Sequence, residues 1–548
     1  MPRRSLSGAS SARASSKAAE RLLGDISFSK PANAHHAVIA LRMHVTGDHV
    51  NLIDQGRDYL DKPHLHFWLV SMSYKLWGVN AFAYKFPSFL FALAGVYSTF
   101  KLGVILYSKD TGRLASLMLA ASFGFLLSVS DVRMDAILVS CIAFASWQLV
   151  LLAVSGKWNH VFGSALGLAL GFCTKGHIAV FIPVLFCFLY LLWKKEWRQL
   201  RLLQWLSIVM LFLVFVSPVL YCYYVQFNLH PEKTVRGRDQ INGVKFILWD
   251  QVLDRMSGKM EKQTHYDPLF FLHSFLVAFA PWSILAYLAV GDRMRRFGKI
   301  KWEFASSLLI FIVFVLVSIS RYQLPHYLNV IFPFSALLAA ALVVLHPPTG
   351  KWLQALTVMQ MIISLLILIA AALVNAWFFP VNSGWVIAGI ILLLSLLIYF
   401  IKSRNYDLRQ RAVCLSVGSM LFFFFLMNTN FYPQLLKYQG GKDLAFASRT
   451  LIAGDPVYVW DNTFSSSFHF HSGKFRLPFH DSILLKQDSI WLLFDETEET
   501  SVRDKYELEK PLLSAEDFEV TRLTLKFLDP STRKDQTTRL VLGRIKRK

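Results

Sequence analysis

Long apolar stretches recur along the first 430 residues of this 548-residue chain, and they constrain its fold more than any other feature. Each stretch is close to the roughly 20 residues that one helix needs to cross a lipid bilayer. Charged residues make up only 17% of the chain, against about a quarter in an average soluble protein. This pattern excludes a soluble enzyme, a disordered protein and a small disulfide-linked scaffold. We predict an α-helical polytopic membrane protein with about twelve spans, near residues 85–107, 114–130, 135–154, 159–174, 177–193, 202–226, 268–290, 303–320, 324–345, 353–379, 383–401 and 412–428.

Basic residues concentrate in every second loop between these stretches. One set of loops carries seventeen lysines and arginines, whereas the short loops of the other set carry only Arg133, Lys175 and Arg321. Loops rich in Lys and Arg face the cytoplasm. Most of the net charge of +21 therefore indicates membrane orientation. The basic residues do not cluster on one polar face, so the sequence does not predict nucleic-acid binding. The loops at 33–84 and 227–267 are predicted on the outer side, together with the C-terminal tail.

The tail at 434–548 differs from the rest of the chain. It alternates short apolar runs of strand type with turn residues, at 457–460, 489–494 and 539–545. This pattern is typical of strands in a soluble domain. We predict a small α/β or α+β domain there, outside the membrane.

The start of the chain is harder to interpret. Residues 1–32 form a basic, low-complexity segment that contains no span and no signal-peptide core. An outer loop at 33–84 requires a crossing before it, so either a first span is missing or the predicted topology is wrong at its beginning. We favour the missing span, with residues 1–32 as an aberrant start and a genuine cytosolic tail as the alternative. Within that loop we expect an amphipathic helix at 33–46 and an interfacial or re-entrant helix at 63–78.

Ionisable and aromatic side chains gather at the predicted outer ends of several spans. Charges beside lipid are costly, so their presence predicts function. Together they supply cations that hold a phosphate and carboxylates that serve as a base or as metal ligands. This combination of cationic and acidic side chains suits an anionic, lipid-linked phosphate substrate. The residues are Tyr59, Asp61, Lys62, Asp131, Arg133, Asp135, Lys175, His265 and Tyr327.

A purely structural explanation stays open for each of these residues. Lys62 and Lys175 could anchor helices at the membrane interface, and Asp131 could simply pair with Arg133. A lone histidine such as His265 is more often structural than a metal ligand. No phosphate-binding loop, serine-hydrolase motif or zinc-protease motif is present, so ATP-driven chemistry and serine hydrolysis have no support.

The order and spacing of four motifs resemble one family of glycosyltransferases. The motifs are Tyr59-Leu60-Asp61-Lys62-Pro63, Asp131-Val132-Arg133-Met134-Asp135, Thr174-Lys175-Gly176 and the segment 322–327. They resemble the protein O-mannosyltransferase superfamily of the GT-C fold, in particular its bacterial 4-amino-4-deoxy-L-arabinose transferase-like branch, over residues 33–430. The resemblance implies a polyprenyl-phosphate-linked sugar donor and a lipid (lipid A-like) or protein acceptor. It also implies a bacterial inner-membrane location with a periplasmic C-terminal domain.

The resemblance implies roles for individual residues. Asp61 and Asp135 would be catalytic carboxylates, and Asp61 would share a divalent metal ion with His265. The other cavity residues would bind the donor phosphate, namely Tyr59, Lys62, Arg133, Lys175 and Tyr327. Neither the sugar nor the acceptor is specified.

Three positions depart from the family pattern. His64 and His177 each replace a proline, and Ala32 stands where the family has an acidic residue thought to act as base on the acceptor. The base could then be His35, His36 or Asp135. The alternatives are a catalytically impaired relative that binds lipid-linked sugars and, in a different class, a lipid-linked sugar transporter or flippase.

Overall fold

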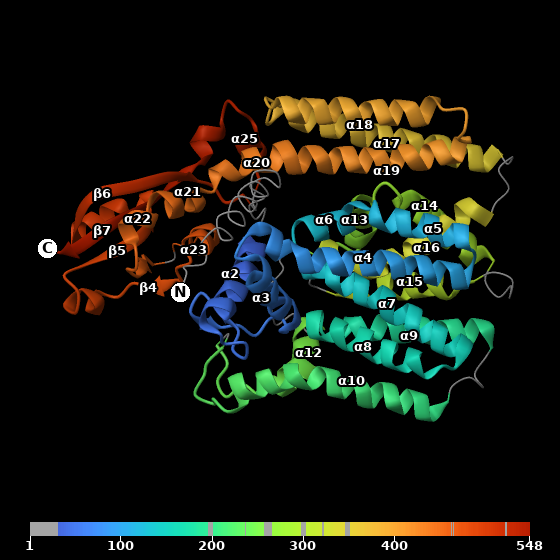
Figure 1. Cartoon of the computed structure of the whole chain (residues 1–548), viewed down its shortest axis with the longest axis horizontal. Coiled ribbons are helices and arrows are strands. Elements are labelled where there is room, and N and C mark those ends of the chain that lie inside the picture. Colours follow the sequence, from blue (N-terminus) through green and yellow to red (C-terminus); the bar gives the residue numbers. More distant parts are fainter. Residues whose placement is uncertain are drawn as a thin grey trace, which may run out of the picture.

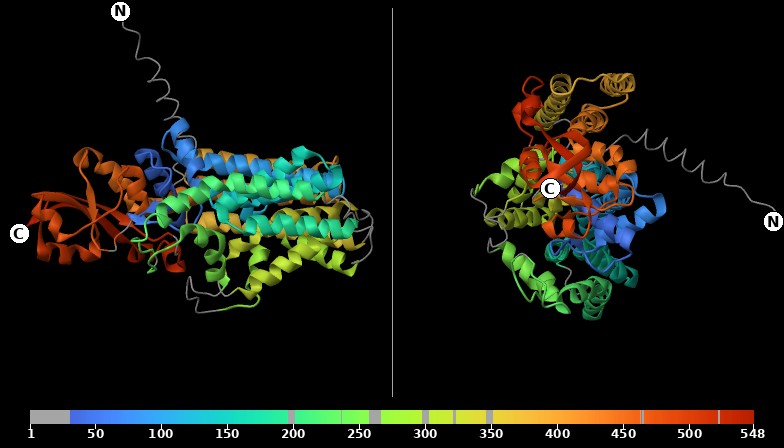
Figure 2. Two further views of the ribbon diagram at one scale, coloured as in Figure 1. Left: turned by 90° about the horizontal axis from the view of Figure 1, so that it is seen from below. Right: turned by 90° about the vertical axis from the view of Figure 1, so that its left-hand side faces the viewer.

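The structure is a computed structural model with two parts, a bundle of long helices and a C-terminal α/β domain at one end of it (Figures 1 and 2). We call the end of the bundle that carries the C-terminal domain the outer end. The turn between α18 and α19, which carries Lys402, Arg404, Arg409 and Arg411, lies at the opposite end (Figure 1). The structure describes residues 31–195, 201–235, 237–256, 266–296, 303–320, 323–345, 351–461, 463, 465–520 and 523–548. The predicted segment 1–32 lies outside the described residues except for its last two positions.

Each of the twelve predicted spans is helical in the structure. Seven helices within the described ranges are long and apolar enough to cross a membrane, and eight if the bent pair α5–α6 counts as one span. Many large apolar side chains on α17 and α18 point away from the protein, such as Leu373 and Leu392, which is typical of helices that contact lipid. The helices are α4 (Ala81–Leu106), α5 (Lys109–Ala120), α6 (Phe123–Ser130), α7 (Met134–Ser155), α8 (Trp158–Lys175), α9 (Ile178–Lys194), α10 (Leu202–Tyr223), α13 (Phe270–Ala278), α14 (Ser283–Arg295), α15 (Ala305–Ile319), η4 (Pro325–Ile331), α16 (Phe332–Leu345), α17 (Lys351–Trp377), α18 (Gly384–Lys402) and α19 (Leu408–Leu426).

Two predicted spans are broken rather than straight. The stretch 114–130 bends by 55° between α5 and α6, where the Ser122 hydroxyl donates to the Leu119 carbonyl and the Phe123 amide donates to the Ala280 carbonyl. The stretch 268–290 divides into α13 and α14 around Pro281, which cannot donate a helical hydrogen bond. Both breaks therefore end helices inside apolar sequence.

Close helix packing in the bundle depends on small residues. A Cβ atom added to Gly95 of α4 would meet the Ser140 hydroxyl of α7 at 2.4 Å, and one added to Gly103 would meet the backbone of Gly112 on α5 at 2.6 Å. Backbones can approach this closely only where side chains are small. α4 is thereby packed closely against both α5 and α7.

The outer segment before α4 forms a small structure of its own. It contains α2 (Pro31–Thr46), a hairpin of β1 (Ile53–Asp54) and β2 (Arg57–Asp58), and α3 (Leu65–Trp77). The predicted helices at 33–46 and 63–78 are therefore present. Consecutive residues from Ala37 to Leu41 are buried, so α2 is enclosed on most sides rather than amphipathic. The long outer loop after α10 adds η2 (Tyr224–Asn228), α11 (Gly243–Lys245), η3 (Phe246–Asp250) and α12 (Gln251–Met256).

The tail forms the predicted soluble domain, a five-stranded mixed sheet in the order β4-β3-β5-β7-β6. β3 lies parallel to β4 and β5, whereas β7 lies antiparallel to β5 and β6. The three predicted apolar runs fall on β3, β5 and β7. The elements, after the linking segment η5 (Met427–Phe431), α20 (Tyr432–Leu435) and η6 (Leu436–Tyr438), are α21 (Gly440–Ala447), α22 (Arg449–Ile452), β3 (Val457–Val459), α23 (Ser466–Ser472), β4 (Leu477–Pro478), η7 (Asp481–Leu485), β5 (Ser489–Asp495), η8 (Glu496–Glu498), α24 (Glu499–Lys505), β6 (Tyr506–Asp517), α25 (Leu525–Leu528), η9 (Arg533–Gln536) and β7 (Thr538–Arg547).

The C-terminal domain contacts the outer segment directly, with α23 beside α2 (Figure 1). The ring centroids of Phe470 and Tyr74 lie 6.4 Å apart. The Arg42 guanidinium lies over the Phe475 ring, and Arg476 Nη1 donates to Gln55 Oε1 at 3.3 Å. These contacts join the last domain to α2, α3 and the β1–β2 hairpin.

Candidate active site

A buried ion pair connects the outer ends of α7 and α8. Asp135 lies in the first turn of α7, and Lys175 is the last residue of α8. Lys175 Nζ lies 2.7 Å from Asp135 Oδ1, and the two side chains are only 10% and 6% exposed. A buried charge is tolerated when it is paired and hydrogen-bonded. The pair therefore fixes the Lys175 ammonium group, which also lies 5.8 Å from the centre of the Tyr327 ring.

A second ion pair lies in the turn between α6 and α7. Arg133 Nη2 lies 3.1 Å from Asp131 Oδ2, as the sequence-based alternative anticipated. Between them Val132 has a φ of 51°. This conformation is an outlier for a β-branched residue and costs about 1–3 kcal/mol. The fold imposes this strained turn, which places the Arg133 guanidinium beside the start of α7.

The third predicted cation precedes α3. Lys62 Nζ lies 2.9 Å from Asp61 Oδ2, and both side chains are partly exposed. The backbone carbonyl of Asp61 accepts a hydrogen bond from Gln251 Nε2 at 2.8 Å. The long outer loop therefore holds the Asp61-Lys62 segment in place from outside.

These separate pairs converge on one region. His326, near the start of η4, lies within electrostatic range of Asp135, Lys175, Arg133 and Lys62. Three cations that are more than forty residues apart in sequence are thus brought together at the outer end of the bundle, each paired with its own carboxylate. A cluster of this kind suits a multiply charged phosphate.

Tyr59 connects this cation cluster to α2. Its hydroxyl lies 3.2 Å from His36 Nε2, and His36 lies within electrostatic range of Lys62 and Lys175. The seven predicted donor-site and catalytic residues that the structure describes are therefore neighbours, namely Tyr59, Asp61, Lys62, Arg133, Asp135, Lys175 and Tyr327. His265 lies outside the described residues.

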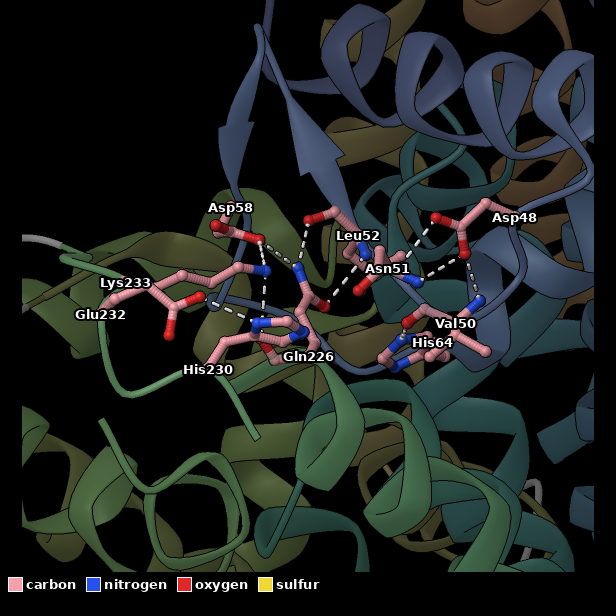
Figure 3. A network of polar contacts seen from close by, with 10 residues as sticks. All are labelled: Asp48, Val50, Asn51, Leu52, Asp58, His64, Gln226, His230, Glu232 and Lys233. Atoms are coloured by element: carbon pink, nitrogen blue, oxygen red, sulfur yellow. Dashed lines mark hydrogen bonds and ion pairs between the residues drawn. The ribbon is translucent and has the colours of Figure 1, made fainter. Parts of the chain in front are cut away.

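The two outer loops that frame the site are tied to each other (Figure 3). The Gln226 side-chain amide exchanges hydrogen bonds with the Leu52 backbone, at 3.0 and 2.8 Å. Gln226 Nε2 also donates to Asp58 Oδ1 at 2.9 Å, and Lys233 Nζ lies 3.0 Å from the same oxygen. The loop after α10 therefore supports the β1–β2 hairpin, which leads into Tyr59 and Lys62.

The two histidines that replace family prolines have a defined structural role. His64 Nε2 donates to the Val50 carbonyl at 2.8 Å, and His177 Nε2 donates to the Leu248 carbonyl at the same distance. Burial lowers the pKa of His64 to about 4, so its ring is neutral at physiological pH. Each histidine fastens an outer loop where a proline would stiffen the chain without a hydrogen bond.

Three functional candidates were missed by the sequence analysis. Lys85, near the start of α4, lies within electrostatic range of Asp131, and its position inside an apolar span was the available signal. His326 belongs to a segment that had drawn attention for Tyr327 alone. Asp54 lies in a two-residue strand beside His35, and no sequence pattern marks it.

The predicted metal site involves Asp61 and His265, and only Asp61 lies among the described residues. Asp61 provides one carboxylate, but Lys62 occupies one of its oxygens. Within the described ranges no three His, Cys, Asp or Glu side chains come together in a way that would hold a metal ion. The divalent metal therefore stays a prediction, and no chemical step below depends on it.

Comparisons with known sequences agree with the motifs. The family model described as dolichyl-phosphate-mannose-protein mannosyltransferase matches residues 61–222. The undecaprenyl phosphate-alpha-4-amino-4-deoxy-L-arabinose arabinosyl transferase of Pseudomonas aeruginosa is 27% identical over 321 residues, which is 57% of this chain and 55% of the relative. The chain thus spans about half the length of the curated relatives that it matches first. An uncharacterised protein of Aquifex aeolicus is 24% identical over 83% of each chain.

A solved structure matches nearly the whole chain. ArnT from Cupriavidus metallidurans, in a crystal structure with bound undecaprenyl phosphate, has a TM-score of 0.71 and 16% identity over 98% of each chain. The structure of the same protein in the apo state has a TM-score of 0.68 over 93% of each chain. The predicted GT-C fold and the resemblance to the arabinose transferase-like branch are confirmed, and the protein is a multi-pass membrane protein.

Proposed function

We propose that this GT-C-fold membrane protein, similar in sequence to the undecaprenyl phosphate-aminoarabinose transferases, is a glycosyltransferase. It moves a sugar from a polyprenyl-phosphate donor to a lipid (lipid A-like) or protein acceptor. The observation that carries this proposal is the convergence of Lys62, Arg133 and Lys175 at the outer end of the bundle, within range of one histidine.

The reaction is a direct displacement at the anomeric carbon. An acceptor hydroxyl oxygen bonds to that carbon, and the bond from the carbon to the phosphate oxygen breaks. The polyprenyl phosphate leaves with the bonding electron pair and gains negative charge. Lys62, Lys175 and Arg133 are placed to stabilise that charge, and fixed cations at developing charge are worth several kcal/mol in the transition state.

The two predicted catalytic carboxylates have different settings. Asp135 holds Lys175, and its pairing and burial favour a role in positioning that cation. Asp61 pairs with Lys62 and is partly exposed, so substrate can reach its side chain. If a divalent metal ion binds, Asp61 and His265 would hold it, and the ion would supply additional positive charge for the phosphate.

The expected orientation of the protein in the membrane supports a reaction on the outer face of that membrane. The basic turn between α18 and α19 lies at the end of the bundle opposite the candidate site, and basic loops favour the cytoplasmic side. We infer that the protein lies in the bacterial inner membrane, with the site and the C-terminal domain facing the periplasm. Asp135 and Lys175 lie at helix ends instead of mid-span, which disfavours the transporter alternative.

A transfer assay tests the proposal. Membranes that contain the full chain are incubated with labelled polyprenyl-phosphate sugars, and the labelled product is identified. We expect a labelled lipid or protein, and Lys62→Ala should reduce its formation by about 10²-fold or more. Lys486→Ala, a change at an exposed lysine of the C-terminal domain, serves as the control. Donor binding without transfer to any acceptor would identify a non-catalytic relative and contradict the proposal.

A further inference from the structure

The displacement requires a group that accepts the proton of the acceptor hydroxyl. The sequence leaves Asp135, His36 and His35 as candidates. Asp135 is poorly placed, because one of its oxygens is 2.7 Å from the Lys175 ammonium group and its side chain is only 6% exposed. One of its two oxygens is therefore already committed to a cation, and its burial limits access by an acceptor.

His36 is also poorly suited. Its Nε2 atom faces the Tyr59 hydroxyl at 3.2 Å, and its Nδ1 atom is buried without a hydrogen-bond partner among the described residues. Burial, reinforced by nearby His35, His66, Lys62 and Lys175, holds the pKa of His36 well below its ordinary value. A group with a strongly lowered pKa is a weak proton acceptor.

His35 has the setting that the other two lack. Its Nδ1 atom lies 3.5 Å from Asp54 Oδ2, and its side chain is 24% exposed. Asp54 Oδ1 is buried and has no hydrogen-bond partner in the part of the chain that the structure describes. The Asp54 carboxylate therefore has the His35 imidazole as its near partner.

The His35 ring also lies beside the donor site. Its centroid is 5.9 Å from that of Tyr59 and 4.3 Å from that of His36. Tyr59 is three residues from Lys62, and His36 lies within electrostatic range of Lys62 and Lys175. The His35 imidazole thus lies beside His36, which is itself within electrostatic range of the cations that would hold the donor phosphate.

We propose that His35 is the general base of the transfer and that Asp54 is its positioning residue, an inference that rests on the proposed function. As the acceptor oxygen bonds to the anomeric carbon, its proton moves to Nε2 of His35. The bond between the sugar and the phosphate breaks, and the phosphate keeps the electron pair. Asp54 holds Nδ1–H and stabilises the imidazolium ion, the arrangement by which a carboxylate supports a histidine base.

Other charged groups face this dyad from neighbouring elements. Arg476 of the C-terminal domain lies within electrostatic range of Asp54 and Arg57. Its guanidinium is held by Gln55 and by the Asp461 carbonyl. Arg476 therefore brings a positive charge of the C-terminal domain near Asp54, the carboxylate that orients the base.

The test compares His35→Ala, His35→Glu and Asp54→Asn with His49→Ala, a change at an exposed histidine of the same outer segment. All are full-length proteins in membranes, assayed for sugar transfer and for binding of undecaprenyl phosphate. We expect His35→Ala to lower transfer by roughly 10²–10⁴-fold while phosphate binding is unchanged. Added imidazole should restore part of the lost rate, and His49→Ala should match the wild type.

A conservative variant separates a base from a structural residue. His35→Glu should retain part of the rate, because a carboxylate can also accept the proton of the acceptor hydroxyl. Asp54→Asn should lower the rate less than His35→Ala does.

The outcomes distinguish the two proposals. Absence of transfer by wild-type membranes would overturn the proposed function and the base together. Wild-type transfer that persists in His35→Ala would overturn only the base. So would loss of undecaprenyl-phosphate binding in His35→Ala without rescue by imidazole, since that combination indicates a structural role.

Discussion

The ion pair between Asp135 and Lys175 allows stability and catalysis to be tested with one set of variants. Asp135→Asn leaves the Lys175 ammonium group, 10% exposed, without its carboxylate partner. Lys175→Met leaves the Asp135 carboxylate buried without its hydrogen-bonded partner. Breaking a buried pair by removing one partner costs about 3–5 kcal/mol, so we expect each single variant to lose stability in that range.

The double variant should behave differently. Replacing both partners by neutral groups removes both uncompensated charges, and such replacements are often neutral or stabilising. We therefore expect the combined change to cost clearly less than the sum of the two single changes, which is the sign of coupling between the two side chains. Transfer should stay low in the double variant, because the cation that faces the donor phosphate is absent.

The assay has two parts. Unfolding by denaturant in mixed detergent micelles gives the free energy of unfolding for the four proteins of the cycle, and the labelled-sugar assay gives their transfer rates. Additive losses of stability would show that the two side chains do not interact as the structure places them. A double variant that transfers sugar at the wild-type rate would refute the role of Lys175 at the phosphate.

Three further predictions use residues outside the bundle. Burial raises the pKa of Asp517 to about 6, so its ionisation disfavours the folded state increasingly from about pH 4 and fully above about pH 6. Asp517→Asn should then raise the thermal unfolding midpoint at pH 7.5 and lose this advantage at pH 4. His64 has a pKa lowered by burial to about 4, so stability should fall as pH decreases from about 6.5 towards 4; His64→Gln should flatten that slope in a pH series of unfolding midpoints. Arg476→Ala removes the hydrogen bond to Gln55 and should increase the rate at which protease separates the C-terminal domain from the membrane part, measured by gel analysis against Lys486→Ala.

The sequence anticipated the features that are set by lipid and by local chemistry. Apolar stretches predicted the helices because a backbone inside a bilayer must satisfy its own hydrogen bonds. Lys62, Arg133 and Lys175 were predicted because a charge at the end of a span stands out against apolar neighbours. Only the resemblance predicted that these three residues line the same cavity, because they are far apart in the chain.

The features that sequence analysis missed depend on tertiary contacts. The bend between α5 and α6 involves the Ala280 carbonyl, which lies far along the chain from Phe123. The pairing of His35 with Asp54 joins a helix to a two-residue strand, and strands this short carry no periodic pattern. α2 was predicted to be amphipathic, but the C-terminal domain and α3 cover it on several sides, and no local pattern shows a partner more than four hundred residues away.

The contact between Arg476 and Gln55 spans 421 positions of the chain, and this separation has a consequence for biosynthesis. Gln55 belongs to the hairpin that carries Asp54, and the ribosome produces this hairpin before any membrane helix of the bundle from α4 onward. Its partner on the C-terminal domain is made only after α19 has been completed. The contact between this hairpin and the C-terminal domain therefore forms last, although the hairpin is synthesised first. A chain that stops after α19 would contain every cation of the donor site and still lack the support behind its proposed base.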